Sequence, residues 1–297
     1  MSLVLAVKYQ LTGARLLATL LIILMIQTPR NSYAQTDSSN TTGIILASIL
    51  PAGIVGGALY QNYATWWKGA QHASFNFSND PPYAYHADKL GHAFFTTISA
   101  DIIRRGYIIA GVDSKTATWI GAGSALLAQT LVEVEDGFHT GTDYFGFSPG
   151  DEAGDILGAA LPVMQEYVPY LRNFKYKWSI WPSEVYNAGV YHTIIDDNES
   201  QFFWISVNLR SITENNFFPS FLNPALGYGV ENLPAAAFIP SRIGKQPASL
   251  WFIALDLNFE GLPIHGQVWD VIAEVLDHFH VPLPALQFAP KVKFLLR

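Results

Sequence analysis

The hydrophobic pattern of the chain changes character near residue 174. Before that point, apolar residues recur at the three- and four-residue spacing of helices, and after it they alternate with polar residues at strand spacing. We therefore expect an α+β fold. A membrane-associated bundle of about four helices should be followed by an antiparallel β-sheet or a partial barrel.

Four segments of the first half predict helices. Residues 41–67 contain no charged side chain and are long enough to span a bilayer, although a buried helix kinked at Pro51 has the same pattern. Further helices are predicted at residues 86–110, 115–136 and 149–164. The last begins after Ser148, a favourable N-cap, with proline at its first position and an acid at residue 151 where a capping box places one.

Two glycine pairs in these helices have the spacing that permits close helix contact. Gly53 and Gly57 form one pair, and Gly154 and Gly158 form the other. In the helix at 86–110, Asp101 is four residues before Arg105, which allows an ion pair on one face. Charges there argue against a simple membrane-spanning segment.

The second half predicts strands separated by turns rich in Pro, Asn and Gly. Lys175 and Lys177 alternate with aromatic residues, which is typical of a strand with one buried face. Alternating strands of an exported protein could also face lipid, but five strands need an oligomer to close a membrane barrel. The expected strands are 174–181, 202–212, 225–230, 250–259 and 286–296, with a helix at 268–279.

The N-terminus has the pattern of a signal peptide. Lys8 and Arg15 precede a short apolar run, and Ser32-Tyr33-Ala34 resembles a cleavage site; an uncleaved anchor helix is the alternative. The expected organisation is a signal peptide at 1–34, a tether at 35–42, a helical domain at 43–170 and a β-rich domain at 171–297. We expect an exported, periplasmic, membrane-associated protein, at the outer rather than the inner membrane.

Composition narrows the classes of function. Only 14% of the 297 residues are charged, 50% are hydrophobic and the mean hydropathy is positive, which is typical of a membrane-associated protein. The net charge of -7 argues against nucleic acid as a partner, and the absence of cysteine excludes disulfides and thiolate chemistry. The expected partner is a membrane or envelope component, with a homo-oligomer possible.

Three pairs of chemically active residues occupy the ends of the predicted helices. Each pair has the three- or four-residue spacing that places both side chains on one helical face. If the helices are neighbours, the pairs can converge in one polar pocket. The six candidate catalytic residues are Asp88, His92, Glu133, Asp136, Asp151 and Asp155.

Such a pocket has two chemical uses. Carboxylates with one histidine suit a divalent cation such as Mg²⁺, Mn²⁺ or Ca²⁺, with His92, Glu133, Asp136 and Asp151 as candidate ligands. The same groups suit proton transfer. The structural alternative is that each is a helix cap or an interhelical ion pair. Because acids at a helix C-terminus oppose the macrodipole, residues 133–136 require a cation, a donor cluster or the next helix's N-terminus for compensation.

Two other motifs carry weaker signals. Residues 146–150 match G-x-S-x-G, but Pro149 lacks the backbone N–H that a nucleophile elbow needs after its serine, so Ser148 is expected to be a cap. His278 and His280 could bind a metal, but an isolated H-x-H is weak, and a solvated helix end is the favoured interpretation.

Several of these segments together resemble the YfiM-like family of bacterial envelope proteins, which carry a domain of unknown function. The segments are Trp66-Trp67, DKLGH at 88–92, TLVEVEDGF at 130–138 and GFSPGDEAGDILGAAL at 146–161. The resemblance covers about residues 60–165 and leaves the β-rich half outside. A looser similarity to VanZ-like membrane proteins is weakened by Asp155, where asparagine is more usual. The resemblance implies an exported, membrane-associated helical domain and supplies no reaction.

Three functions fit these observations. The first is a non-enzymatic envelope protein with a structural or interaction role. The alternative is a divalent-metal-dependent hydrolase or transferase at the membrane interface, using the Asp/His/Glu cluster. A third is a binder of small amphiphiles on the aromatic-rich sheet.

Overall fold

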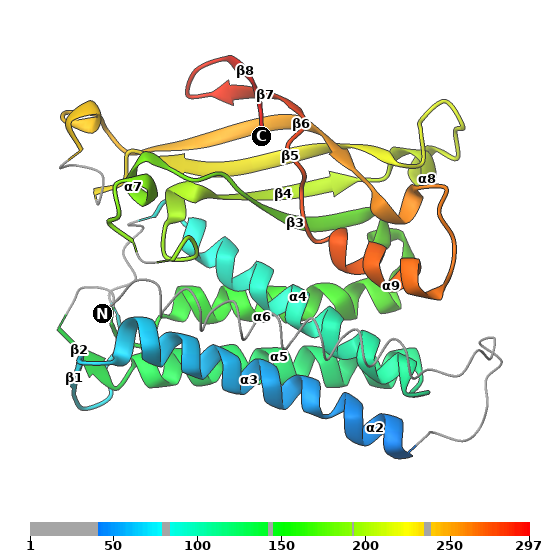
Figure 1. Ribbon diagram of the computed structural model, residues 1–297, viewed down its shortest axis with the longest axis horizontal. Helices are drawn as coiled ribbons and strands as arrows, with labels where there is room; N and C mark the ends of the chain where they lie inside the picture. Colours follow the sequence, from blue (N-terminus) through cyan, green and yellow to red (C-terminus); the bar gives the residue numbers. More distant parts are fainter. Residues whose placement is uncertain (1–40, 79–83, 142–144, 192, 235–238) are drawn as a thin grey trace. The chain divides into compact units, whose positions relative to one another are not determined.

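The computed structural model describes residues 41–78, 84–141, 145–191, 193–234 and 239–297. These residues form one compact unit in which a helical layer lies against one face of an antiparallel sheet (Figure 1). The expected α+β class, with a helical bundle followed by an antiparallel sheet, is confirmed. The expected signal peptide at 1–34 and most of the tether lie outside the described residues.

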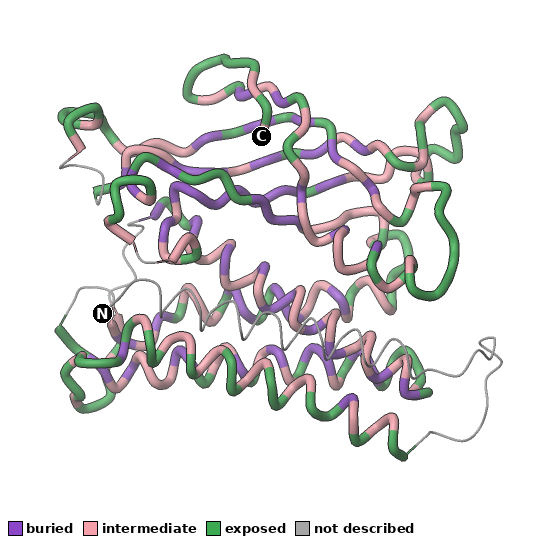
Figure 2. Tube along the Cα trace, viewed as in Figure 1, coloured by how far each residue is buried: buried purple, intermediate pink, exposed green. Residues whose placement is uncertain are grey.

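The first helical segment is apolar and largely exposed. It comprises α2 (Thr41–Ala47), α3 (Ile49–Asn62) and a π-helical turn, η1 (Tyr63–Trp67). The break falls at Ser48 rather than at Pro51, and α2 begins within the expected tether. Among the described residues this 27-residue run is the one helix long and apolar enough to cross a membrane, and only 6% of its apolar 18-residue window is buried. Figure 2 shows the exposed surface along it.

The other three bundle helices follow their predicted boundaries closely. They are α4 (Ala87–Ile109), α5 (Ser114–Asp136) and α6 (Pro149–Tyr167). Asp113 caps α5 by accepting a hydrogen bond from Thr116 N at 3.0 Å, and Ser148 Oγ caps α6 by accepting from Asp151 N at 3.1 Å. The serine of the G-x-S-x-G match is thus a helix cap, as expected.

Glycine permits the close approach of α6 to α4. A Cβ added at Gly154 would lie 2.6 Å from Lys89 O, and one added at Gly158 would lie 2.3 Å from Ala93 O. Both contacts are with backbone, so a larger residue would force the helices apart. The other predicted pair makes no such contact, since no described atom lies within 4 Å of a Cβ added at Gly53 or Gly57.

The sheet has six strands in sequential order, and every pair is antiparallel. A bridge between Trp178 and Phe279 also joins the first strand to the segment that leads into the fifth, so the sheet curls toward a partial barrel. The strands are β3 (Phe174–Ile180), β4 (Gln201–Val207), β5 (Leu222–Glu231), β6 (Ala248–Leu257), β7 (Pro284–Ala289) and β8 (Lys293–Leu296).

Two predicted strands were too long. The strand expected at 202–212 ends at Val207, because Asn208 caps a short helix, α8 (Leu209–Thr213), by accepting a hydrogen bond from Ser211 N. The strand expected at 286–296 is two strands, β7 and β8, joined by a turn that contains the cis peptide Ala289-Pro290. The helix expected at 268–279 is α9 (Gln267–Leu276).

Aromatic side chains join the helical layer to the sheet. Phe94 of α4 is fully buried and lies 5.5 Å from Trp178 of β3, ring centre to ring centre. Phe203 of β4 belongs to the same buried cluster. Because α4 contacts both the sheet and the other bundle helices, this core fixes where its first turns, and hence Asp88 and His92, are held.

The remaining elements are short. They are β1 (Gln71–His72) paired with β2 (His139–Thr140), α7 (Glu184–Asn187), and the 3-10 turns η2 (Pro169–Asn173), η3 (Asn198–Ser200), η5 (Pro240–Arg242) and η6 (Phe259–Gly261). The β1–β2 pair links the segment after η1 to the segment after α5, beside the site described next.

Candidate functional site

Three helix ends meet at one end of the bundle. The N-terminus of α4, the C-terminus of α5 and the N-terminus of α6 lie together because the three helices run alternately up and down. His92, Glu133 and Asp151 each present one ligand atom, and these three atoms all lie within 4.8 Å of one another. The structure therefore brings together one residue from each of the three predicted pairs.

Asp155 holds the imidazole of His92 in one orientation. His92 Nδ1 lies 3.2 Å from Asp155 Oδ2, and Thr96 Oγ1 donates to Asp155 Oδ1 at 2.8 Å. Gln129 Nε2 approaches the same oxygen at 3.4 Å. Asp155 is completely buried. With Nδ1 engaged, the Nε2 atom faces Glu133 Oε1, 3.8 Å away, and is the nitrogen available to bind a ligand.

Glu133 is buried, with 3% of its surface exposed, and its two carboxylate oxygens have different surroundings. Oε2 accepts a hydrogen bond from the backbone N–H of Ser148 at 3.0 Å, and Oε1 faces His92. The N-terminus of α6 thus compensates the acid at the end of α5. Only half of the capping box expected in α6 forms. Ser148 Oγ accepts from Asp151 N, but the Ser148 N–H donates to Glu133 instead of to the Asp151 side chain.

Asp151 is consequently directed toward α4. Its Oδ1 accepts from Lys89 Nζ at 3.0 Å, and the same ammonium donates to Asp88 Oδ2 at 2.9 Å. Asp88 lies in the first turn of α4, where the N-cap position belongs to His86 and carries no side-chain cap. Asp88 is therefore connected to the cluster through its ion pair with Lys89 and does not cap the helix.

Asp136 is not among the residues that supply the three converging ligand atoms. Its Oδ1 accepts a hydrogen bond from Trp67 Nε1 at 2.5 Å, which ties the end of the apolar helical segment to α5. Trp67 in turn stacks on His139, whose ring Nδ1 lies 2.8 Å from Glu135 O. Of the four predicted metal ligands, the structure gathers three and places Asp136 beside them.

Burial and crowding shift the titration of this cluster. Burial lowers the pKa of His92, but the carboxylates of Asp155, Asp151 and Glu133 outweigh it and raise that pKa to about 10. Burial raises the pKa of Glu133 to about 8, against the opposing effect of His92. Burial also raises the pKa of Asp136 to about 6. Burial is thus the main cause of both raised carboxyl pKa values.

A second polar cluster in the sheet was missed by sequence reasoning. Lys177, which the alternating pattern treats like Lys175, is fully buried, with its Nζ 2.8 Å from Asp256 Oδ2 and 3.3 Å from Asp277 Oδ1. His280 Nδ1 lies 2.8 Å from Asp256 Oδ1. The strand register places these polar groups on the same face of the sheet as the buried residues Trp204 and Phe252, and alternation alone could not distinguish such a buried ion pair from a solvated one.

Two further interpretations of charged residues are corrected. The helix end at His278 and His280 is buried and not solvated: His280 stacks on Trp204 at 3.9 Å, and His278 Nε2 lies 3.5 Å from Asp101 Oδ2. Asp101 pairs with Arg104 at 3.2 Å rather than with the residue four positions on, because Arg105 turns to Glu274 at 3.1 Å.

Comparisons with known proteins add no assignment, since no family model, no curated protein and no solved structure matches this chain.

Proposed function

We propose that this protein is a membrane-anchored, divalent-cation-dependent hydrolase or transferase whose ion is held by His92, Glu133 and Asp151. The observation that carries the proposal is the convergence of three ligand atoms from three helices within 4.8 Å. Ligand bonds of about 2.0–2.6 Å place the atoms around one ion at separations of this order.

The charge balance around these residues supports a bound cation. Five carboxylates gather at the helix ends, and the ion pairs that the described residues make with them come from Lys89 and His92. Uncompensated buried carboxylates are costly, and a dication offsets them directly. Two carboxylates with one imidazole suit Mn²⁺, while the imidazole also admits Zn²⁺ or Fe²⁺. The five carboxylates are those of Asp88, Glu133, Asp136, Asp151 and Asp155.

A metal site also requires ligands that are held in fixed orientations, and two of the proposed ligands meet this requirement. Asp155 fixes the His92 ring and Ser148 N–H fixes the Glu133 carboxylate. Three protein ligands leave coordination positions for water and substrate, and a bound ion would acidify that water. Lys89, held between Asp88 and Asp151, offers a positive charge beside the same place for an anionic substrate group.

The membrane location belongs to the same proposal. The apolar, exposed segment Thr41–Trp67 supports an anchor, and its last residue reaches the site through the Trp67–Asp136 hydrogen bond. We propose export by the N-terminal signal peptide to the periplasm, association with the outer membrane, and membership of the YfiM-like group. An amphiphilic substrate at the membrane interface and a homo-oligomer are consistent with this placement.

Metal content decides the proposal. The full chain, purified in detergent and dialysed against Mn²⁺, Zn²⁺ or Mg²⁺ and then against buffer, should retain one equivalent of ion by elemental mass spectrometry. His92→Ala, Glu133→Gln and Asp151→Asn should each lose it. Glu135→Gln, which changes an acid of the same helix outside the ligand set, should keep it. A wild-type chain that retains none of the three ions contradicts the proposal.

One observation favours a purely structural role as the second candidate. Lys89 already bridges Asp88 and Asp151, so the cluster can tie α4 to α6 without an ion. A non-enzymatic envelope protein of this kind would show a lower melting temperature for Asp88→Ala and Asp151→Ala, with no metal bound by the wild-type chain.

A further inference from the structure

The sheet carries an exposed apolar surface beside the part that the bundle covers. On the face toward the bundle, α4 covers β3 and β4, where Phe203 belongs to the buried cluster around Phe94. The same face continues across β5 to β8 as a row of cross-strand partners, whose side chains stand next to one another. The row consists of Ile205, Leu226, Ile253, Leu286 and Phe294.

Neighbouring positions widen this row into a patch. Leu255 and Leu296 each lie two residues beyond a member of the row, on β6 and β8, so both share its face. Trp251 pairs with Tyr228, which lies two residues beyond Leu226 on β5. We call six residues the sheet patch, and each of them is at least 37% exposed: Leu226, Trp251, Ile253, Leu255, Phe294 and Leu296.

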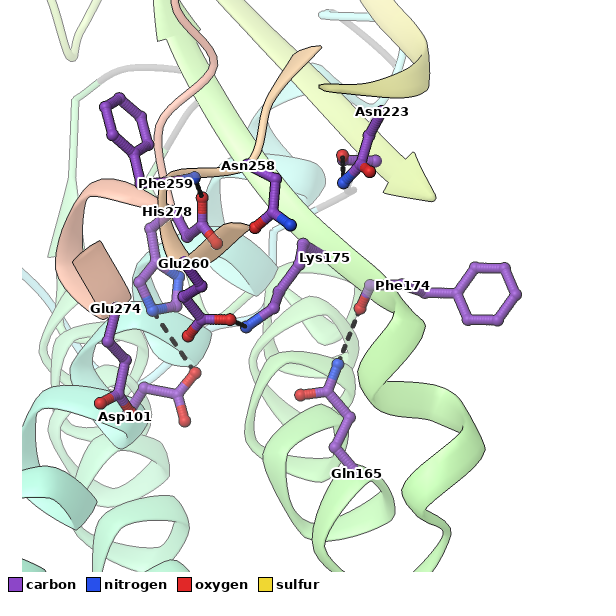
Figure 3. A network of polar contacts seen from close by, with 12 residues as sticks. Asp101, Gln165, Phe174, Lys175, Asn223, Asn258, Phe259, Glu260, Glu274 and His278 are labelled. Atoms are coloured by element: carbon purple, nitrogen blue, oxygen red, sulfur yellow. Dashed lines mark hydrogen bonds and ion pairs between the residues drawn. The ribbon is translucent and has the colours of Figure 1, made fainter. Parts of the chain in front are cut away.

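The charged and amide side chains of the sheet lie on the opposite face. Lys175 of β3 and Asn223 of β5 belong to that face, where Lys175 Nζ lies 3.2 Å from Glu260 Oε2 (Figure 3). Among the positions of β5 to β8 on the patch side, all of which are described, none carries a charged side chain. An antiparallel sheet with one solvated face normally has the reverse arrangement, with its polar side chains in water. The patch therefore has the composition of a surface that is covered.

The patch has the size of a protein–protein interface. A fully exposed large apolar side chain presents roughly 200 Å², so the exposed fractions of the six residues amount to on the order of 600 Å². A stable interface buries about 800 Å² on each partner, and in homodimers about 65% of that area is apolar. The apolar area that a stable dimer needs on each copy, about 500 Å², is thus present.

The edge of the sheet argues against lipid as the covering material. β8 is the last strand, and among the described strands it pairs only with β7. Its other edge has no partner strand beside Phe294 and Leu296, whereas open sheet edges do not occur in the hydrocarbon region of a bilayer. Lys291 and Lys293 are exposed at this edge and hinder direct edge-to-edge pairing of two sheets. Contact between two sheet faces is the arrangement that remains.

We propose that the sheet patch binds the sheet patch of a second copy of this chain, face to face, in a two-fold symmetric dimer. In such a contact the same surface of each copy covers the other, so Ile253 and Phe294 are buried on both sides. The dimer extends over β5 to β8 the apolar packing that α4 provides over β3 and β4. This surface is separate from the His92 cluster and does not depend on the ion or the reaction proposed there.

The test uses the full chain, which has no cysteine, so that one introduced cysteine gives one labelled position. Ile253→Cys, at a side chain that is 54% exposed, carries a nitroxide label, and the chain is reconstituted in phosphatidylcholine vesicles with excess lipid. A chain that does not enter the vesicles is measured in the same way in buffer. Because face-packed sheets lie about 10 Å apart, double electron–electron resonance should give a label separation below about 30 Å between two copies.

Two phenylalanines provide a matched pair of variants in the labelled chain. Phe294→Asp should abolish the coupling between labels, because it would bury an unpaired charge in the dimer. Phe217→Asp should leave the coupling unchanged, since Phe217 lies in the turn after α8, outside the patch. The two side chains are 86% and 84% exposed, so neither substitution disturbs the core of the monomer.

The accessibility of the label identifies any other occupant. In the proposed dimer the label is coupled and is protected from a water-soluble nickel chelate. A label without coupling that is reached by oxygen and not by the chelate lies in lipid, and one reached by both lies in water; either result overturns the proposal. Coupling that persists in the Phe294 variant also overturns it, because the contact then lies elsewhere. None of these outcomes bears on metal content, so the two proposals fail separately.

Discussion

Glu133, at the end of α5, accepts a hydrogen bond from the backbone N–H of Ser148, the residue that caps α6. This hydrogen bond thereby joins the last turn of α5 to the N-cap residue of α6, which lies 15 residues later in the chain. The bond offsets the unfavourable position of an acid at a helix C-terminus, because the N-terminus of α6 carries the opposite partial charge. It also fixes the Glu133 oxygen that faces His92, so helix capping and the proposed ion site share the same group.

This relationship predicts an unusual response to Glu133→Gln. Glutamine retains an oxygen that can accept the Ser148 N–H, and it removes a carboxyl group whose ionisation burial makes unfavourable. In chelator, the variant should be as stable as the wild-type chain or more so, by urea unfolding. Saturating Mn²⁺ should stabilise the wild type, by about 2.7 kcal/mol at 100 times the dissociation constant, and leave the variant unchanged.

Glu133→Ala provides the control. It removes the acceptor and leaves the buried Ser148 N–H without a partner, which should lower the free energy of unfolding by about 1–3 kcal/mol with or without metal. Equal losses for the glutamine and alanine variants in chelator would show that the charge itself stabilises the fold.

The close contact of α4 with α6 predicts that Gly158→Ala is destabilising. The added methyl group would lie 2.3 Å from the Ala93 carbonyl, so the helices must separate, at a cost of about 1–3 kcal/mol. Separation would also move Asp155 away from His92. The matched control is Gly123→Ala in α5, where no described atom lies within 4 Å and helix propensity predicts a small gain. Thermal unfolding of both variants measures the difference.

The helical half was predicted well because its signals are local. Proline and serine at 148–149, an aspartate at 113 and the acidic stretch 133–136 mark helix ends within one turn of their observed positions. The sequence predicted the meeting of these ends only if the helices are neighbours, and in the structure α4, α5 and α6 do contact one another. The strand ends at 207 and 289 depend on a local cap and a turn that interrupt otherwise continuous alternation.

The site was predicted in part for the same reason. His92 and the acids of α5 and α6 stand at helical spacing, so their convergence required only antiparallel neighbours. The hydrogen bonds from Ser148 N–H to Glu133 and from Trp67 to Asp136 depend on side-chain directions that spacing does not specify. The clusters around Lys177 and Asp277 join residues about 100 positions apart across the sheet, for which the pattern gives no signal.

His278 predicts a pH dependence of stability. Burial lowers its pKa below 6.5. The positive charges of Lys175 and Lys177 lower it further, whereas the carboxylates of Asp101 and Glu260 oppose this shift. The folded chain then binds fewer protons than the unfolded chain, so this contribution is full above pH 6.5 and is lost as the pH falls toward the folded-state pKa. Between pH 7.5 and 5.5, His278→Gln should therefore lose less stability than the wild type.

The comparison must be made as a difference between the two chains in the absence of divalent cations. The contribution of His92 to stability depends on pH in the opposite direction. Its raised pKa gives stability that is present below pH 6.5 and is lost as the pH rises. That contribution is common to both chains and cancels. Urea unfolding at the two pH values measures the difference, and identical losses for the two chains would contradict the assignment of His278 as a buried neutral group.

The two lysines of β3 provide the sharpest test of the buried cluster. Lys177→Met leaves Asp256 and Asp277 without their shared cation in a fully buried place, which should cost about 3–5 kcal/mol. Lys175→Met removes an ion pair with Glu260 whose partners are both partly exposed, worth about 0–1 kcal/mol. The two substitutions are chemically identical and two residues apart on one strand. Urea unfolding that gave them equal effects would show that Lys177 is not buried with its two acids.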